Sequence, residues 1–371
     1  MQEQSITPHI QKLEKLILDS EQRFSILGAA IIIATILMFL AAIYVQPSFE
    51  ATSHGIYYAK LASDPFHCKS NPNAYRILTP LISYAIGLKG NGILITNLLI
   101  AWLIIVLLYY FCRKSNNSPL FSFLQAAIIT FSMPTLFTIY YGGYTDSTTY
   151  LIILLIMYMI NKQKTFLVWT LFLFGLLNRE SIIFLLPFFF LLAARKRFKI
   201  AANISGVVIS IGIYLVIRNF ISQHIIVEHS AELYFGVLIN DIFYWLRQSI
   251  YAYSVGMFSV FKIFWLIPII AVFLCARRNN YFGVVLIISP IICSMFQSLF
   301  AVDTSRLISM SFPAMLLGMD LIKDEWGNEK MQSLVSVIFL VNFLVPQLYV
   351  TSNNISIMHS LPTSMVKWML L

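Results

Sequence analysis

The chain has 371 residues, of which 59% are hydrophobic and only 11% charged, with a formal net charge of +9. One soluble core could not bury this much apolar surface, so the composition excludes a single soluble domain and indicates that the lipid bilayer is the solvent. The positive charge does not indicate a nucleic-acid partner, because the basic residues gather in short connectors between apolar runs.

The apolar runs recur along the chain and are bounded by charged residues or by Asn, Gly and Pro. Backbone groups in lipid must be satisfied internally, so these runs predict an all-α, polytopic membrane protein with about eleven spans. We place the spans at residues 25–46, 92–112, 120–140, 146–161, 165–177, 181–194, 200–217, 254–276, 282–300, 305–322 and 331–350. Residues 1–24 then form an N-terminal segment, 25–350 the multi-pass domain, and 351–371 a tail.

The connectors that follow alternate spans carry the basic clusters, such as Arg113 with Lys114, Arg195 to Lys199, and Arg277 with Arg278. The positive-inside rule places these clusters, and with them the N-terminus, in the cytoplasm. The tail and two long segments, 47–91 and 218–253, then lie outside. We therefore expect the chemistry of the protein on the non-cytoplasmic side.

The first external loop contains apolar positions at helical spacing over residues 55–62 and 77–88. This pattern predicts two short helices along the membrane interface. The loop also carries potentially reactive or ligand-binding side chains: Glu50, His54, Tyr57, Tyr58 and Arg76. Two interpretations stay open, namely interfacial anchors with tyrosines at headgroup depth, or a platform that faces a substrate.

Three further external positions have similar pairs of interpretations. Asp146 follows Gly142, Gly143 and Tyr144 at the head of a span, where a carboxylate either caps the helix or lines a cavity. The Arg179-Glu180 pair and Arg306 are either solvated connectors or clamps for a lipid phosphate.

The order of these features resembles the GT-C superfamily of membrane glycosyltransferases. The resemblance rests on Gly55-Ile56-Tyr57-Tyr58-Ala59, on Tyr75 to Leu81, on Thr145-Asp146, on Gly175 to Glu180 with Pro187, and on Arg306 with Pro313. It covers most of residues 25–322. One departure is clear, because His54 stands where such proteins commonly have an aspartate before Gly-x-Tyr-Tyr.

The resemblance implies an enzyme that moves a sugar from a polyprenyl-phosphate donor to an envelope glycan, lipid or protein acceptor. It also implies an integral protein of the bacterial inner membrane in contact with membrane lipids. The implied base or alignment groups are Asp146, Glu50 and His54, and the implied phosphate ligands are Arg76, Arg179 and Arg306. Around them, Tyr57, Tyr58, Tyr144 and Glu180 would contact the substrate. A divalent metal stays open as a cofactor, although no residue spacing indicates a set of metal ligands.

Other classes of protein fit parts of the same pattern. An O-antigen polymerase or polysaccharide ligase would place its chemistry on the 218–253 segment, with Arg218, His224, His229 and Arg247. A transporter or flippase would instead show internal symmetry and intramembrane charges. An inactive membrane scaffold would explain the missing aspartate at position 54.

Overall fold

The structure is a computed structural model that describes residues 7–68, 71, 73–224, 250–298, 303–351 and 354–360, with three single positions beyond. The chain up to His224 forms α1 (Thr7–Tyr44), α2 (Gly55–Ser63), α3 (Leu78–Ala85), the 3₁₀ helix η1 (Gly90–Gly92), α4 (Ile93–Lys114), α5 (Pro119–Thr130), α6 (Met133–Tyr140), α7 (Asp146–Asn161), α8 (Thr165–Asn178), η2 (Glu180–Leu185), α9 (Leu186–Arg195) and α10 (Ile200–His224).

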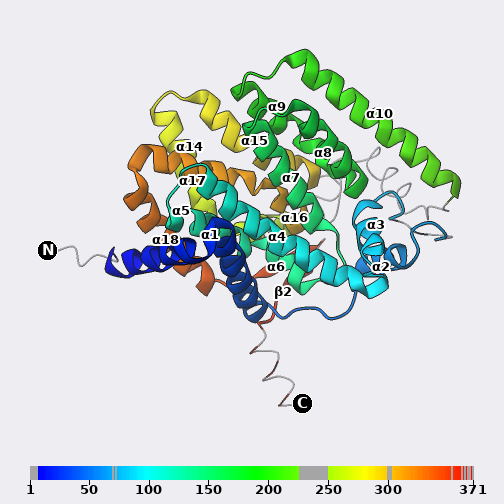
Figure 1. The fold of residues 1–371 in the computed structure, drawn as a ribbon, viewed down its shortest axis with the longest axis horizontal. Coiled ribbons are helices and arrows are strands. Elements are labelled where there is room, and N and C mark those ends of the chain that lie inside the picture. Colours follow the sequence, from blue (N-terminus) through cyan, green and yellow to red (C-terminus); the bar gives the residue numbers. More distant parts are fainter. Residues whose placement is uncertain are drawn as a thin grey trace.

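The second part forms α13 (Ile250–Phe261), η3 (Lys262–Trp265), α14 (Leu266–Arg277), α15 (Tyr281–Ser298), α16 (Thr304–Ile308), η4 (Ser309–Ser311), α17 (Pro313–Trp326) and α18 (Asn328–Leu344), followed by the hairpin strands β1 (Leu348–Thr351) and β2 (Asn354–Ile357). Figure 1 shows these helices as one bundle, with the hairpin near the C-terminus.

Six helical stretches within the described residues are long and apolar enough to cross a membrane: 11–44, 90–114, 200–224, 251–277, 281–298 and 304–326. The pair α5 and α6, bent by 48°, could make a seventh. Helices α7 and α8 are apolar but shorter. The chain is therefore an all-α membrane protein with several long apolar helices.

Several boundaries differ from the sequence prediction. The span predicted at 331–350 ends as a helix at Leu344, and residues 348–350 belong to β1, so the fold contains a small hairpin. The run at 181–194 divides into η2 and α9. Pro187 lies in the first turn of α9, where the N–H that proline lacks would have no helical partner in any case. Helix α10 continues to His224, whereas residues 225–249, which include His229 and Arg247, lie outside the described residues.

Helix α1 is bent where the predicted N-terminal segment meets the first span. Ser25 interrupts the helical backbone with φ 68°, and Figure 1 shows the two parts of α1 running in different directions. Of the spans, α10 is peripheral, since only 17% of its most apolar stretch is buried inside the protein, compared with 89% for residues 304–326. The stretch at residues 304–326 is therefore the most buried of these six, and it carries Arg306.

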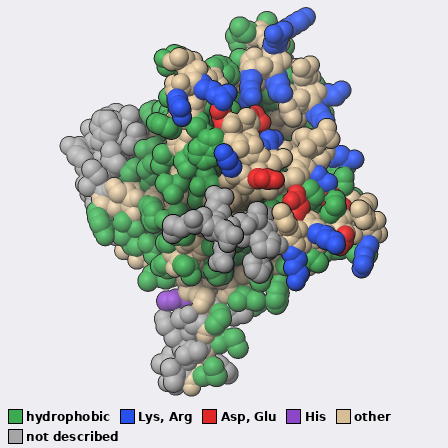
Figure 2. Space-filling model, turned by 90° about the vertical axis from the view of Figure 1, so that its left-hand side faces the viewer, with side chains coloured by type: hydrophobic (Ala, Val, Ile, Leu, Met, Phe, Trp, Pro, Cys, Tyr) green, Lys and Arg blue, Asp and Glu red, His purple; other side chains and the backbone are tan. Residues whose placement is uncertain are grey.

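The basic connectors meet at one end of the bundle. Glu21 Oε1 lies 2.5 Å from Arg113 Nε, and Lys323 Nζ donates to Asn117 Oδ1 at 2.6 Å. Figure 2 shows the Lys and Arg side chains gathered over part of this face, beside a broad hydrophobic area. The helices α2 and α3 lie away from it (Figure 1). The clustering that the sequence predicted on one side is thus a property of the fold.

This separation predicts the outcome of a topology experiment. Reporters fused after Lys199 or Arg278 should both report the cytoplasm, and one inserted near Cys68 should report the opposite side, because basic clusters orient the spans. Compartment-specific reporters would measure this. A reporter after Lys199 that is active outside the cell would contradict the assignment of both faces.

Candidate functional site

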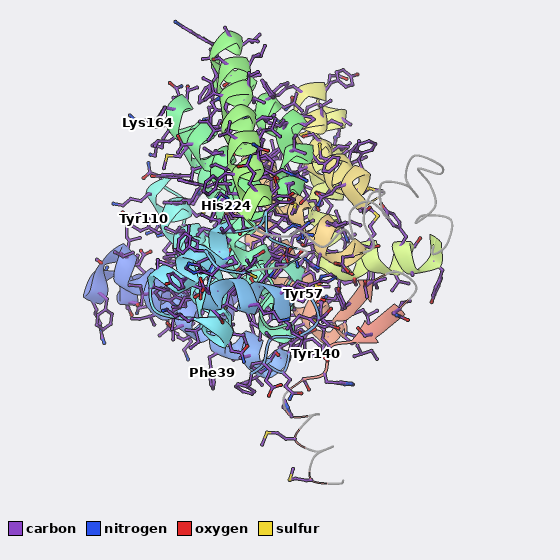
Figure 3. The ribbon with its side chains drawn as sticks, turned by 90° about the vertical axis from the view of Figure 1, so that its right-hand side faces the viewer. Phe39, Tyr57, Tyr110, Tyr140, Lys164 and His224 are labelled. Carbon is purple, nitrogen blue, oxygen red and sulfur yellow. The ribbon has the colours of Figure 1, made fainter. Side chains whose placement is uncertain are left out.

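The first loop packs against the turn between α6 and α7 at the end remote from the basic connectors. Ser48 N donates to the Ile139 carbonyl at 2.9 Å, and Thr52 N donates to the Gly142 carbonyl at 3.1 Å. Figure 3 views the molecule from this side, with α2, which carries Tyr57, in front. These contacts bring residues 48–58 close to the turn that precedes Asp146.

Two glycines make this close packing feasible. A Cβ on Gly142 would lie 2.4 Å from the Glu50 carbonyl oxygen, and a Cβ on Gly143 would lie 2.9 Å from Gly55 Cα. Gly143 also has φ +90°, which L side chains rarely adopt. The paired glycines are therefore required where the turn meets the first loop.

Replacing Gly143 by Ala should consequently destabilise the protein by about 1–3 kcal/mol, through backbone strain and the steric conflict with Gly55. Thermal unfolding of the detergent-solubilised protein would measure the loss. Gly212 in α10 is the matched control, because nothing lies within 4 Å of the position that a Cβ would take there. Gly212→Ala should leave stability unchanged or raise it slightly, and equal melting temperatures for the two variants would contradict the prediction.

The centre of the site is Asp146, the first residue of α7, whose side chain is only 1% exposed. Arg306 Nε donates to Asp146 Oδ2 at 3.2 Å, and Arg306 Nη2 lies 3.1 Å from the same oxygen. Arg179 Nη1 forms a second ion pair, with Asp146 Oδ1. Asp146 thus holds two arginines, which come from the end of α8 and from α16.

Arg306 is also bound on its other side. Its Nη1 donates to Asp303 Oδ2, and its guanidinium lies 4.3 Å from the ring centre of Tyr144. Asp303 in turn accepts hydrogen bonds from Tyr349 OH at 3.2 Å and from Thr351 Oγ1 at 2.7 Å, both on β1. Burial opposes the ionisation of Asp303, but Arg306 and the Thr351 hydroxyl hold the pKa of its carboxyl below the usual range.

Arg179 is positioned by the residue before it. The Asn178 side-chain amide donates to the Thr145 carbonyl at 2.9 Å and to Thr149 Oγ1 at 2.8 Å, which fixes the end of α8 against the start of α7. Arg179 itself is buried, and its Nε has no hydrogen-bond partner among the described residues. An unsatisfied buried donor is costly, so the position of Arg179 depends on its ion pair with Asp146.

A second ion pair lies beside this centre. Arg76 Nε donates to Glu180 Oε2 at 3.1 Å, and Arg76 Nη1 donates to Tyr58 OH at 3.1 Å. Tyr214 OH donates to Glu180 Oε1 at 3.3 Å and accepts from Arg218 Nη1 at 3.3 Å. Arg76 is 32% exposed, so unlike Arg179 and Arg306 it can be reached from outside.

His54 lies just before α2 and is exposed. Its ring centre is 6.4 Å from that of Tyr144 and 6.1 Å from that of Tyr57. Partial desolvation lowers the pKa of His54, and the positive charges of the three arginines lower it further, against the opposing charge of Asp303. A lowered pKa favours the neutral imidazole, which is the form able to accept a proton. Glu50 is also exposed, and its backbone carbonyl accepts from Ser48 Oγ at 2.7 Å.

The structure therefore brings most of the sequence-predicted residues into one cluster at one end of the bundle. Sequence reasoning missed Asp303, Tyr349 and Thr351 as partners of Arg306, and it missed the positioning role of Asn178. The three-residue spacing of Asp303 and Arg306 is visible in the sequence and is compatible with an ion pair. The contact of Asp303 with Tyr349 and Thr351 on β1 could not be read from the sequence. Within the described residues no three His, Cys, Asp or Glu side chains come together as ligands for a metal.

No protein-family model and no curated protein matches this sequence. A functional proposal therefore rests on the geometry of the cluster.

Proposed function

We propose that the protein is a membrane glycosyltransferase of the GT-C type, which transfers a sugar from a polyprenyl-phosphate donor to an envelope glycan, lipid or protein acceptor. The observation that carries the proposal is the buried set of two arginines around Asp146, placed beside the exposed His54 of the first loop. Transfer from a lipid phosphate needs a base for the acceptor hydroxyl and cations for the departing phosphate.

The contacts favour particular roles for these side chains. Asp146 is paired with two guanidinium groups, so we assign it the task of orienting Arg179 and Arg306, and we assign proton acceptance to His54. Tyr144 and Tyr58 contact Arg306 and Arg76 and help to hold them. We assign contact with the acceptor to Tyr57 and to Glu50, which is exposed at the edge of the cluster.

Three arginines of the site each face a carboxylate without a substrate. Arg76, Arg179 and Arg306 face Glu180, Asp146 and Asp303. An incoming phosphate must therefore compete with at least one carboxylate, and the pair most open to solvent is Arg76 with Glu180, at 32% and 31% exposed. We propose that Arg76 exchanges Glu180 for a phosphate oxygen when the donor binds, because a guanidinium can bind either group through two N–H donors.

The proposal includes an arrangement in the membrane. The shorter helices α7, α8, α9 and α18 would complete about eleven crossings or partial crossings. The N-terminus and the basic connectors would face the cytoplasm, and the cluster around Asp146 would face the other side of a bacterial inner membrane.

The polymerase or ligase alternative keeps one supporting contact. Arg218, at the start of the 218–253 segment, reaches Glu180 through Tyr214. If this alternative holds, Arg218→Gln should abolish the reaction and His54→Gln should not. The glycosyltransferase proposal expects the larger loss in the His54 variant.

A comparison of lipid-linked sugars and envelope glycans would test the proposal directly. Cells that lack the gene should accumulate one polyprenyl-phosphate sugar and lose one glycan modification. Expression of the wild-type chain should reverse both changes, and expression of His54→Gln should reverse neither. Identical profiles with and without the gene would overturn the proposal.

A further inference from the structure

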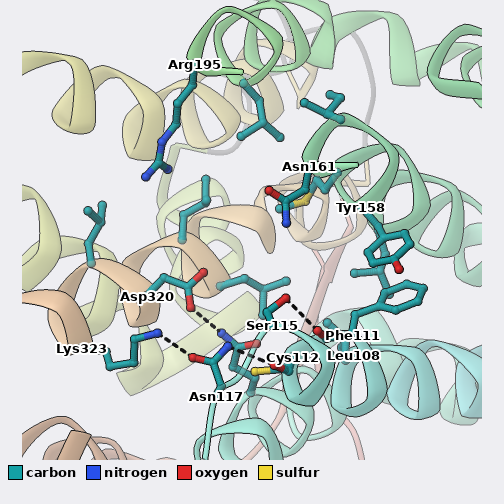
Figure 4. A pocket seen from close by; sticks show the side chains of 18 of the residues that line it. Leu108, Phe111, Cys112, Ser115, Asn117, Tyr158, Asn161, Arg195, Asp320 and Lys323 are labelled. Atoms are coloured by element: carbon teal, nitrogen blue, oxygen red, sulfur yellow. Dashed lines mark hydrogen bonds between the residues drawn. The ribbon is translucent and has the colours of Figure 1, made fainter. Parts of the chain in front are cut away.

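A second group of polar side chains lies at the basic end of the bundle. It surrounds a cavity of about 340 Å³ between α4, α7, α9 and α17, shown in Figure 4. None of its lining residues belongs to the cluster around Asp146, so it is a separate feature of the molecule.

The cavity is amphipathic. Its apolar lining includes buried leucines, one from each of the four helices: Leu108, Leu154, Leu192 and Leu316. Its polar lining includes Asp320, within α17, and residues at helix ends and connectors, namely Asn117, Asn161, Arg195, Lys196 and Lys323. A ligand that fits must therefore combine a polar or charged group with an apolar portion.

One wall of the cavity is already held in place by internal contacts. Lys323 Nζ donates to Asn117 Oδ1 at 2.6 Å, and Gln125 Nε2 donates to Asp320 Oδ1 at 3.3 Å. These bonds connect α17 to α5 and to the connector before it. The acidic wall is therefore satisfied without a ligand.

On the facing wall, Arg195 and Asn161 are exposed to solvent and have no such protein partner in the described part of the chain. Figure 4 shows Arg195 and Asn161 pointing into the cavity from the ends of α9 and α7. Arg195, Lys196 and Asn161 make no side-chain hydrogen bond or ion pair with another described residue, although all three line the cavity. Two cations and an amide thus border the same space, and their side-chain N–H groups have no partner among the described residues.

We propose that this cavity binds the phosphodiester headgroup of an amphiphile, with the phosphate on Arg195 and Lys196 and the beginning of the apolar chains against the leucines. The cavity is lined by three cations, Arg195, Lys196 and Lys323, and by two carboxylates, those of Asp320 and Asp324. One phosphodiester carries one negative charge and would neutralise this excess. A guanidinium and an amide N–H are strong donors to phosphate oxygens.

The location separates this ligand from the proposed sugar donor. The cavity opens among the connectors that the basic residues place in the cytoplasm, so its ligand would come from that leaflet or from the cytoplasm. The inference does not depend on the glycosyltransferase proposal, because the lining residues and the membrane face differ.

Binding measurements on the purified full-length protein in non-ionic detergent would test the inference. The probes are dihexanoyl phosphatidylglycerol, glycerol 3-phosphate, inorganic phosphate and the uncharged dioctanoyl glycerol. Arg195→Gln with Lys196→Gln should weaken binding of the phosphatidylglycerol by at least about tenfold, because two charged donors are lost. Asn161→Trp, at the exposed rim, should block the cavity while leaving its buried floor intact.

The matched control removes the same charge from the same connector. Arg197 and Lys199 are exposed and do not line the cavity, so Arg197→Gln with Lys199→Gln should change the affinity by less than about twofold, the weak effect expected of screened surface charges. Equal losses in both double variants would reduce the binding to general surface attraction and overturn the proposal.

The probes also decide the source of the phosphate. If only the phosphatidylglycerol binds in a way that depends on Arg195, the ligand is a lipid headgroup. If glycerol 3-phosphate or inorganic phosphate binds as tightly through the same residues, the cavity takes a soluble phosphate compound. Binding of dioctanoyl glycerol as strong as that of the phosphatidylglycerol, or no binding of any phosphate probe, would contradict the inference.

Discussion

Asp146→Asn should lower the stability of the protein by about 3–5 kcal/mol, the usual cost of removing one partner from a buried ion pair. Two guanidinium groups, those of Arg179 and Arg306, would lose their buried counter-charge. If Asp146 only capped its helix, near-normal membrane expression of this variant would be expected, because an amide can still cap a helix. The burial of Asp146 changes that expectation.

Thermal unfolding in detergent would measure the effect of Asp146→Asn. Asp64→Asn is the control, since Asp64 lies in the nearby first loop but is half exposed beside His67, and it should leave the melting temperature unchanged. A double variant with Arg306→Gln should lose less stability than the sum of the two single variants, because the residues share an interaction. If the stability losses of the two single variants simply add in the double variant, Asp146 and Arg306 are not energetically coupled.

His54→Gln should reduce sugar transfer by roughly 10²- to 10⁴-fold, the usual contribution of a general base. A base acts in its neutral form, so the rate should rise with pH through the pKa of His54 and remain constant above it. Because the surroundings lower this pKa, the midpoint should lie below the ordinary value of about 6.5. The protein should therefore keep its transfer activity at mildly acidic pH.

A profile of kcat/KM from pH 5 to pH 8, taken with the donor identified by the glycan comparison, would locate this midpoint. His67→Gln serves as the control, because His67 is exposed in the same loop and pairs only with Asp64 in the contacts described. The control should keep both the rate and the pH midpoint of the wild type. Wild-type transfer by His54→Gln would remove the imidazole from the mechanism.

Much of the architecture follows from the sequence because it depends on local chemistry. Apolar runs of sufficient length must be helical in lipid, so the long helices were predictable. The basic clusters predicted one charged end, and the structure has one. The two short helices of the first loop also occur, at Gly55–Ser63 and Leu78–Ala85, because their apolar positions repeat at helical spacing.

Other features depended on contacts between distant segments. Nothing local distinguishes an Asp146 that caps its helix from one that holds two arginines, and the choice depends on Arg179 and Arg306, which lie 33 and 160 residues further along the chain. The hairpin at residues 348–357 was missed because its apolar start continues the preceding helical run. Its position beside Asp303 is a tertiary contact.

The sequence by itself therefore determined that the protein lies in a lipid bilayer, where its long helices are and that its basic charge is clustered. These features depend on the hydrophobicity and charge of residues that are neighbours in the chain. Only the tertiary structure decided which carboxylate meets which arginine. A charge is tolerated at low exposure only when a counter-charge is nearby. For Arg306 that condition is met by Asp146 and Asp303, which the fold places on either side of one guanidinium group.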